Sequence, residues 1–462
     1  MGPRPRLGRR LALAVVALIA LVGSFPAPTA RAEAPPHLGY GTTGGVEALG
    51  FDWIKTLGRP AGGEARKLVR IDLQASDLAT LDGCLVDLEH DVRQWAEVAD
   101  AYEIGNEPNL DASYGWGAPP NAGDYAHALC RAYATIKAAD PDALVVSAGL
   151  APTGRIPFEW QGHQGYCAPG VSWCPVYYQD EREFLREMLR AGAGACFDAL
   201  GYHPYGFSAP YDAAPGSSAC GANDFCFRGV ERIHAILHDE FGLPQPIWAT
   251  EFGWIVDPRL VGRPECWDDP TMVAFQWMVV SPEAQAANLV GAYQYAAAHY
   301  PWMGAMFFFN YSIASGCDQM AFFSVQGRPA EAALTAMDKR FVPSAAAWRG
   351  TGVVVVDVGA EGVASGELWL DNLSYGRLNW QAAVVPGTPL DGRLTLQAGE
   401  GTLGEPVRFS IGATGLAPGL HRGRIALTAT APLGVLVEDA VQEENVALMV
   451  ATDHVYLPAV SR

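Results

Sequence analysis

Two glutamates follow short apolar stretches of the sequence, each at a point where a β-strand is expected to end. Glu107 is the middle residue of an Asn-Glu-Pro triplet, and Pro108 prevents the preceding strand from continuing. Glu251 lies in a Thr-Glu-Phe-Gly-Trp segment (250–254) that closes a second apolar stretch. Strand ends are where α/β barrels place their catalytic groups. Two carboxyl groups that face each other are the equipment needed to cleave a glycosidic bond.

Strand-like and helix-like stretches alternate between residues 37 and 341. The strand-like runs are His37–Gly41, Asp52–Leu57, Lys67–Leu73, Ala101–Glu107, Ala143–Ala148, Phe197–His203, Pro246–Glu251 and Gly304–Asn310. Stretches with helical spacing include Leu78–Val98, Tyr125–Ala138, Asp180–Leu189, Val230–Phe241, Pro282–Ala298 and Pro329–Phe341. This alternation predicts a TIM (β/α)8 barrel, an α/β fold of about 250 residues that tolerates insertions. The alternative is a doubly wound open sheet, but no glycine-rich phosphate loop follows the first run.

The last part of the chain has a different pattern. After residue 351 there is no cysteine and little helical periodicity, and short alternating stretches are separated by Pro-Gly and Asp-Gly turns. This pattern is typical of an all-β sandwich of immunoglobulin size. We therefore divide the chain into a signal peptide (1–32), a (β/α)8 domain (33–342), a linker (343–351) and a β-sandwich domain (352–462).

The beginning of the chain has the composition of a secretory signal. Four arginines precede the apolar run Leu11–Val22, and a small-residue cleavage site ends at Ala32. A membrane anchor is the alternative, but the run is shorter than the roughly 20 apolar residues that a spanning helix needs. We expect cleavage after Ala32, secretion to the extracellular space or cell surface, and no membrane insertion afterwards.

All nine cysteines lie between residues 84 and 317. In an exported protein this number predicts disulfides with one thiol left over. We expect the pairs Cys167–Cys174, Cys220–Cys226, Cys266–Cys317 and Cys84–Cys130, which leave Cys196 as a free buried thiol. A zinc site is the alternative, but no Cys-x-x-Cys or His-x-x-His spacing supports it. We therefore expect neither a metal nor a cofactor.

The charge balance limits the partners of the protein. The chain has 50 acidic and 31 basic residues, which gives a formal net charge of −19. Such a surface repels nucleic acid and anionic lipid, whereas uncharged substrates remain compatible with it. We expect a monomer that binds carbohydrate and no nucleic acid.

The two glutamate motifs resemble the signatures of clan A glycoside hydrolases, the large group of (β/α)8 retaining glycosidases that includes families 5 and 39. The resemblance covers about residues 37–341. It implies that Glu107 is the acid/base and Glu251 the nucleophile. It also implies that Asn106 binds the sugar 2-hydroxyl. These roles are what the resemblance suggests, and the strand-end positions agree with them.

Two further motifs belong to the same resemblance. The segment from His203 to Tyr205 is similar to the clan's His-x-Tyr, whose tyrosine lies near the nucleophile. Arg70 resembles the arginine that supports the nucleophile, although it lies on the third expected strand and the clan often has it on the second. The clan's tryptophan after strand eight is replaced by Met-Phe-Phe-Phe-Asn (306–310). Because of this departure, the sequence does not assign the chain to one family of the clan. The sugar that it would act on is therefore also left open.

Other residues near these motifs have two interpretations. Glu103 is in phase with Glu107, and we interpret it as a buried partner of a barrel cation such as Arg70, because a lone buried carboxylate is costly. Five tryptophans are candidates either for sugar platforms or for loop cores. They are Trp116, Trp160, Trp173, Trp254 and Trp267. We expect Trp254 and Trp116 to bind substrate.

Three functions agree with this sequence. The first is a secreted retaining glycosidase that cleaves β-glycosidic bonds of a neutral poly- or oligosaccharide by double displacement. The second is a non-catalytic carbohydrate-binding or surface protein on a barrel scaffold. The third is a transglycosylase that uses the same residues. The presence of both carboxylates favours the enzymes, and we expect the sandwich to be a spacer or interaction module.

Overall fold

The structure is a computed structural model. It describes residues 37–45, 49–63, 65–155, 177–342, 344–350, 353–357, 362–372, 378–431 and 437–451. The expected signal peptide, Trp160, Trp173 and the expected pair Cys167–Cys174 lie outside the described residues. None of the helices in the described ranges is long and apolar enough to cross a membrane.

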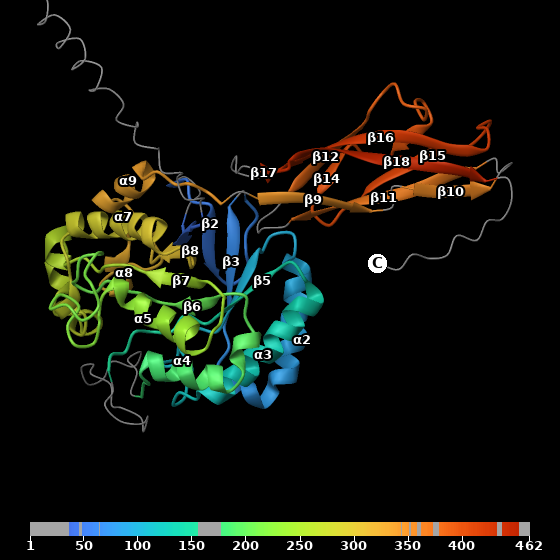
Figure 1. The fold of residues 1–462 in the computed structure, drawn as a ribbon. Helices are drawn as coiled ribbons and strands as arrows, with labels where there is room; N and C mark the ends of the chain where they lie inside the picture. Colours follow the sequence, from blue (N-terminus) through green and yellow to red (C-terminus); the bar gives the residue numbers. More distant parts are fainter. Residues whose placement is uncertain are drawn as a thin grey trace, which may run out of the picture. The chain divides into compact units, whose positions relative to one another are not determined.

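Eight parallel strands form the barrel (Figure 1). They are β1 (Gly39–Thr43), β2 (Trp53–Leu57), β3 (Arg66–Ile71), β4 (Ala101–Ile104), β5 (Leu144–Ser147), β6 (Leu200–Tyr202), β7 (Ile247–Phe252) and β8 (Met303–Phe308). The spatial order is β5-β4-β3-β2-β1-β8-β7-β6, and parallel bridges between Val146 and Ala199 and between Leu150 and Tyr202 link β5 to β6. The predicted TIM barrel is therefore confirmed.

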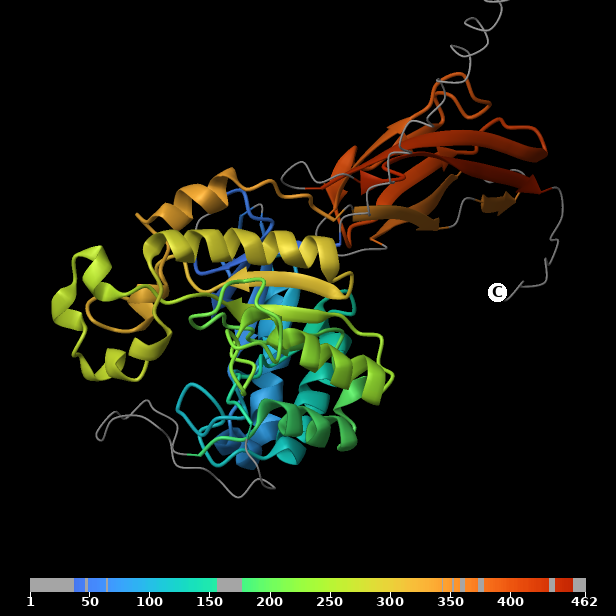
Figure 2. The same cartoon turned by 60° about the vertical axis from the view of Figure 1, so that its left-hand side comes forward.

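Helices cover the outer face of this sheet (Figures 1 and 2). The longer ones are α2 (Leu81–Trp95), α3 (Ala122–Ala139), α4 (Glu181–Arg190), α5 (Val230–His234) continued by the π-helical η5 (Ala235–Glu240), α7 (Pro282–His299) and α9 (Pro329–Ala336). Shorter ones include η2 (Ala75–Thr80), η8 (Gln276–Met278), α6 (Pro270–Val273) and α8 (Met320–Phe323). The described residues between β2 and β3 contain no helix, so the barrel departs there from strict alternation.

The helix boundaries follow local signals in the sequence. Asn121 caps α3, because its side-chain oxygen accepts hydrogen bonds from the backbone N–H groups of residues 123 and 124. Ser281 caps α7 in the same way, and Pro282 occupies the first helical position, where its missing N–H has no consequence. These caps fix where the chain turns back from the strand ends to the outer layer.

The strands are buried, as expected for a parallel sheet that is covered on both faces. All four residues of β4 and all six of β7 are buried. Most of these side chains are apolar, but Lys55 on β2, Glu103 on β4 and Glu251 on β7 are charged and almost inaccessible. Buried charges are strongly destabilising unless they are paired. The side chains that pair with these three charged residues are therefore important for the stability of the barrel interior.

The disulfides differ in part from the expected pattern. Cys220–Cys226 and Cys266–Cys317 are present as predicted. Cys130 pairs with Cys196, and Cys84 is the free cysteine among the described ones. The predictions of a Cys84–Cys130 pair and of a free Cys196 were wrong. Cys130 on α3 faces the turn after α4, which brings its Cα atom to 4.8 Å from that of Cys196.

The C-terminal part contains two five-stranded sheets, as the predicted all-β sandwich requires. One sheet contains β10 (Val353–Asp357), β18 (Val441–Ala451), β16 (Gly419–Thr430), β12 (Asn379–Val384) and β14 (Glu400–Thr402). The other contains β13 (Leu394–Leu396), β15 (Val407–Gly412), β11 (Val363–Asn372), β9 (Ser344–Gly350) and β17 (Val437–Glu438). The expected linker 343–351 is corrected here, because β9 pairs with β11 along that stretch.

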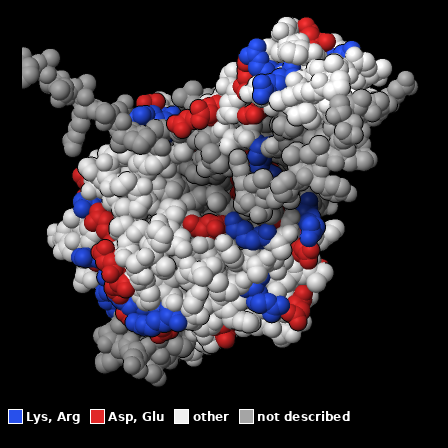
Figure 3. All heavy atoms as spheres, turned by 45° about the vertical axis from the view of Figure 1, so that its right-hand side comes forward, with Lys and Arg blue, Asp and Glu red and all other residues white. Residues whose placement is uncertain are grey.

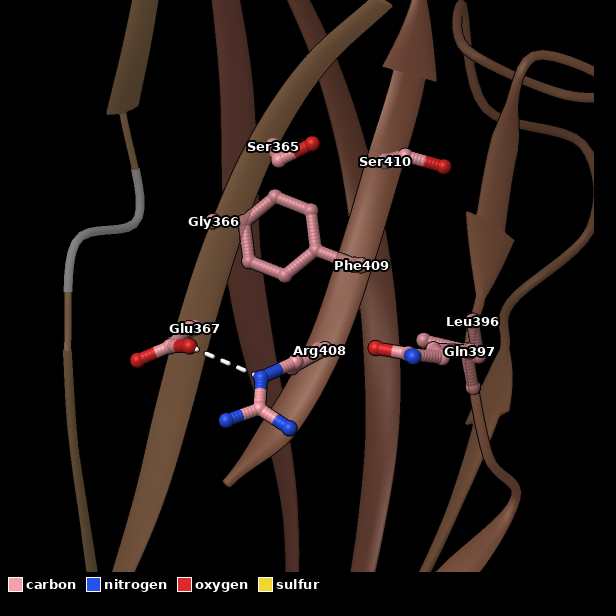
Figure 4. A pocket seen from close by; sticks show the side chains of 8 residues that line it. All are labelled: Ser365, Gly366, Glu367, Leu396, Gln397, Arg408, Phe409 and Ser410. Atoms are coloured by element: carbon pink, nitrogen blue, oxygen red, sulfur yellow. Dashed lines mark hydrogen bonds and ion pairs between the residues drawn. The ribbon is translucent and has the colours of Figure 1, made fainter.

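A hollow on the sandwich is lined mainly by polar and charged side chains (Figure 4). Arg408 donates a hydrogen bond to Glu367 at its edge, at 2.9 Å. The ring of Phe409 is 2% exposed and covers Gly366 as part of the sandwich core. Trp380 is also buried. The described part of this hollow therefore presents no aromatic face to solvent.

Charged side chains are mixed on the surface shown in Figure 3. Acidic groups lie beside Lys and Arg at several places, and the described residues on this face form no continuous basic surface. This distribution agrees with the excess of acidic residues in the sequence.

Candidate active site

The turn after β4 places Glu107 at the mouth of the barrel. Its φ angle is 40°, which is in the left-handed region that residues other than glycine rarely adopt. The backbone N–H of Glu107 donates to the carbonyl of Gly149 at 3.0 Å, so the turn is anchored to the chain after β5. Unusual backbone conformations of this kind gather at functional sites, where surrounding contacts hold them.

Glu251 lies inside β7, and both of its carboxylate oxygens are hydrogen bonded. Lys55 Nζ donates to Oε1 at 3.0 Å, and the hydroxyl of Tyr205 donates to Oε2 at 2.8 Å. Burial raises the pKa of Glu251, but the positive charges of Lys55 and His203 and the two hydrogen bonds outweigh it and lower the pKa to about 2. Glu251 is therefore ionised at any ordinary pH.

His203 lies between the two glutamates. Its Nδ1 is 2.8 Å from Glu107 Oε1 and 3.9 Å from Glu251 Oε2. These two carboxylate oxygens can be separated by no more than the sum of the two distances. A side chain at Gly149 would place its Cβ 2.1 Å from His203 Nε2, so glycine is needed there to leave room for the imidazole ring.

Lys55 is a site residue that the sequence analysis missed. Its side chain is fully buried, and Nζ lies 2.7 Å from Glu103 Oε2 and 3.0 Å from Glu251 Oε1. Burial lowers the pKa of Lys55, but the two carboxylates raise it further, so the net shift is upwards and the amine stays charged. A lysine in the middle of an otherwise buried strand, Trp-Ile-Lys-Thr-Leu, was the available signal.

Arg70 pairs with Asp72 and not with the nucleophile. Its Nε lies 2.9 Å from Asp72 Oδ1, and no ion pair joins it to Glu251. Glu103 is a buried partner of a barrel cation as expected, but that cation is Lys55. The cation that pairs directly with Glu251 is thus Lys55 on β2 and not Arg70 as expected.

Asn106 and Tyr205 lie close to the two glutamates. Asn106 Nδ2 donates to the carbonyl of Tyr114 at 2.9 Å, while its Oδ1 is buried without a hydrogen-bond partner. An unpaired buried acceptor is unfavourable in the empty protein and is suited to a ligand hydroxyl. Tyr205 has a pKa well above its usual value because burial and the charges of Glu251 and Glu107 disfavour the phenolate.

The two expected tryptophan platforms are both buried. Trp254 is 0% exposed, and its Nε1 donates to the carbonyl of Ala209 at 2.7 Å. Trp116 is 1% exposed and packs edge-to-face against Tyr125. Neither ring has a face open to a sugar. Their expected role in substrate binding is corrected to one of packing beneath the loops.

An apolar wall lines one side of the site. Phe309, directly after β8, has its ring centroid 6.2 Å from that of Tyr205 and 5.7 Å from that of Phe323. The wall contains residues from the segments after β7 and β8, and the disulfide Cys266–Cys317 joins these two segments. In the described residues, no group of three or more His, Cys, Asp or Glu side chains could hold a metal ion.

Comparisons with known proteins find only distant likenesses. No protein-family model and no curated protein matches the chain. Among solved structures, an endo-β-1,3-glucanase of glycoside hydrolase family 128 (subgroup II) from Sorangium cellulosum has a TM-score of 0.40 and 13% identity, over 66% of this chain and 99% of that chain. A glycoside hydrolase family 44 endoglucanase from Clostridium thermocellum has a TM-score of 0.37 and 10% identity, over 82% of this chain and 97% of that chain.

A third likeness is to a β-glucuronidase from Bacteroides uniformis, with a TM-score of 0.40 and 11% identity. It extends over 88% of this chain but only 42% of that chain. The solved structures that resemble this chain thus include glycoside hydrolases. At these scores and identities the likenesses carry no argument about its activity, which has to be inferred from the site.

Proposed function

We propose that the chain is a retaining glycoside hydrolase in which Glu251 is the nucleophile and Glu107 the acid/base. The observation that carries the proposal is the pair of carboxyl groups on either side of His203. Their nearest oxygens are no farther apart than the sum of 2.8 Å and 3.9 Å. Retaining glycosidases separate the two groups by about 5–5.5 Å, and inverting ones by about 6.5–9.5 Å to admit a water molecule. The upper limit therefore excludes all but the shortest inverting separations and agrees with the retaining ones.

The proposed reaction gives the two glutamates different tasks. Glu251 is ionised, so it can attack the anomeric carbon while Glu107 gives its proton to the leaving oxygen and the glycosidic bond breaks. The product of this step is a glycosyl ester of Glu251. Glu107, now a carboxylate, then removes a proton from water, which attacks the same carbon and releases Glu251. Each face of the sugar is attacked once, so its configuration is retained.

The surrounding residues have separate roles in this proposal. Lys55 and Tyr205 orient the Glu251 carboxylate and keep it ionised through the hydrogen bonds described above. His203 holds Glu107 towards the same sugar. Asn106 offers its unpaired Oδ1 to the 2-hydroxyl, an interaction that strengthens in the transition state of glycosidases.

We further propose a secreted protein whose substrate is a neutral poly- or oligosaccharide. The three disulfides among the described residues support an oxidising compartment, because such bonds are rare in proteins that stay in the cytosol. We place the boundary between the catalytic barrel and the sandwich before β9, and we keep the sandwich as a spacer or interaction module. We also keep the expectation of a monomer that needs no cofactor.

The stereochemistry of the first product tests the retaining mechanism. We expect proton NMR of an early aryl β-glycoside digest to show the β-anomer of the released sugar, followed by slow mutarotation to the α-anomer. Appearance of the α-anomer first would mean direct attack by water and would contradict the role of Glu251 as nucleophile.

A change at Lys55 tests the electrostatic role of this residue. In Lys55→Met the pKa of Glu251 should rise, because the largest favourable charge is removed. The acidic limb of the kcat/KM profile should then move to higher pH, and kcat/KM at neutral pH should fall by about 10- to 1,000-fold. Lys55→Arg should keep the limb close to its wild-type position, since the charge remains.

The matched control is Lys67→Met, which removes another buried lysine from a barrel strand outside the site. Removal of one partner of a buried ion pair destabilises a protein by about 3–5 kcal/mol, so the profiles should be measured below the unfolding temperature of each variant. An unshifted acidic limb in folded Lys55→Met would show that Lys55 has only a structural role.

A further inference from the structure

An exposed tryptophan lies at the edge of the apolar wall of the site. Trp277 is on η8, in the segment that follows β7, and is 52% exposed. Its ring stacks on Phe207 with a centroid distance of 5.5 Å and an interplanar angle of 20°. Phe225 lies 4.5 Å from Phe207 and 5.8 Å from Trp277. We call these three residues the aromatic cluster.

The aromatic cluster is connected directly to the catalytic residues. Phe207 is two residues beyond Tyr205, whose hydroxyl donates to Glu251. Two residues of chain span at most about 7 Å, so the cluster begins next to the nucleophile. Phe207 also has a φ angle of 52°, which is strained for a bulky side chain. The backbone therefore holds this ring in place at an energetic cost.

The support of Trp277 is rigid. The neighbouring Met278 is 8% exposed and belongs to the apolar wall, whereas the indole points to solvent. The side chain of Gln276 donates to the carbonyl of Trp267 at 2.7 Å, and the disulfide Cys266–Cys317 ties the same segment to the one after β8. The fold thus fixes an apolar ring in an exposed position, where it adds nothing to the core. Together with the partly exposed rings of Phe207 and Phe225 it forms a contiguous apolar patch, and such patches are found at ligand-binding grooves.

We propose that the aromatic cluster is a sugar-binding subsite, with Trp277 as the platform for a pyranose ring of the substrate beyond the ring that is cleaved. The C–H face of a pyranose is apolar and complements the electron-rich face of an indole. Among the described residues, no lysine or arginine lies over any of the three rings, so no cation competes with a sugar for the exposed face of Trp277. We assign an uncharged sugar unit as the occupant, in line with the neutral substrate proposed above.

This inference rests on the proposed function and extends it to the length of the substrate. A platform outside the cleavage site is used only by chains long enough to reach it. The proposed substrate is thus an oligo- or polysaccharide of neutral sugars. The subsite should raise kcat/KM only for substrates long enough to reach it.

The test compares Trp277→Ala with wild-type full-length protein on aryl monoglycosides and on gluco-, xylo- and manno-oligosaccharides of two to six units. Stacking of a ring on an aromatic side chain contributes about 1–3 kcal/mol, as measured for nucleic-acid bases, which corresponds to about 5- to 150-fold in affinity. We expect kcat/KM of Trp277→Ala on the longer oligosaccharides to fall by about 5- to 150-fold. Its kcat/KM on aryl monoglycosides should be unchanged. The kcat/KM of Trp277→Phe on the longer oligosaccharides should lie between those of the wild-type protein and Trp277→Ala, because phenylalanine keeps an aromatic ring.

The matched control is Leu260→Ala, which removes another exposed apolar side chain from the same segment. It should leave all rates unchanged. Equal losses on every substrate in Trp277→Ala, or no loss on any, would overturn the subsite.

A binding measurement keeps this test independent of catalysis. Retardation of native wild-type and Trp277→Ala protein in gels that contain soluble β-glucan, xylan or mannan should show weaker binding of the variant to at least one polysaccharide. If the wild-type protein cleaves nothing but Trp277→Ala still loses retardation, the proposed function fails and the subsite stands. If both proteins migrate alike in every gel, the subsite is wrong whether or not the protein is an enzyme.

Discussion

Glu251→Gln is expected to lower kcat on every glycoside substrate by at least about 10⁴-fold, since loss of a nucleophile has effects of this size or larger in hydrolases with covalent intermediates. Glutamine has nearly the same shape but no negative charge with which to attack the anomeric carbon. Activity should be measured on an activated dinitrophenyl glycoside and on an oligosaccharide. The kcat on the two substrates should fall to the same extent.

The control for this prediction is Glu231→Gln, a half-buried glutamate on α5 that pairs with Arg228 outside the barrel mouth. It should have wild-type kcat. Circular dichroism and thermal unfolding of both variants separate a loss of chemistry from a loss of fold. A folded Glu251→Gln enzyme with more than a few per cent of wild-type kcat would rule out Glu251 as the nucleophile.

Glu107→Gln is expected to behave differently, because its role depends on the leaving group. A dinitrophenolate leaves with little protonation, so the glycosyl ester of Glu251 should still form. Its hydrolysis should be slowed by about 10²- to 10⁴-fold, since no base remains to activate water. The expected observation is a burst of dinitrophenol followed by a slow steady state.

Azide provides the second half of this prediction. The azide anion needs no base, so it should restore steady-state turnover of Glu107→Gln and yield a β-glycosyl azide with retained configuration. Azide should have no effect on the wild-type rate or on Glu251→Gln. Rescue of Glu251→Gln with a β-glycosyl azide, and none of Glu107→Gln, would show that the two roles are reversed, because azide then attacks a glycosyl ester of Glu107.

The barrel was predictable because each part of it leaves a local signal. Parallel strands that are covered on both faces appear as short apolar runs, and the helices between them keep their amphipathic spacing. All eight expected strands overlap an observed one. The start of the sandwich was placed too late because β9, Ser-Ala-Ala-Ala-Trp-Arg-Gly, is rich in small residues and lacks a strand-like run of β-branched residues.

The site was predictable at its centre and less so around it. Glu107, Glu251, His203 and Tyr205 come together because their motifs lie at the carboxyl ends of β4, β6 and β7 of one barrel. The error at Arg70 arose because a strand end does not reveal which cation reaches a buried carboxylate. Lys55 is deeper in the barrel and satisfies two carboxylates at once.

The tryptophans show a different limit of sequence reasoning. Trp254 directly follows the nucleophile motif, yet the ring packs against Gly206 beneath the loops. Trp277 has no motif around it and is exposed beside Phe207. The direction of a ring in a long loop depends on contacts with segments far away in the sequence, and sequence spacing does not reveal them.

The most direct test of the central claim is to identify the residue that carries the sugar. Glu107→Gln should be incubated with a dinitrophenyl 2-deoxy-2-fluoroglycoside, because fluorine at C2 slows release of the intermediate. Intact-mass spectrometry should then show one added glycosyl group, and peptide mapping should place it on Glu251. The same experiment should be done with the wild-type protein, in which Glu107 is present. Attachment of the sugar to Glu107, or to any residue other than Glu251, would contradict the account. Release of dinitrophenol without any adduct would contradict it as well.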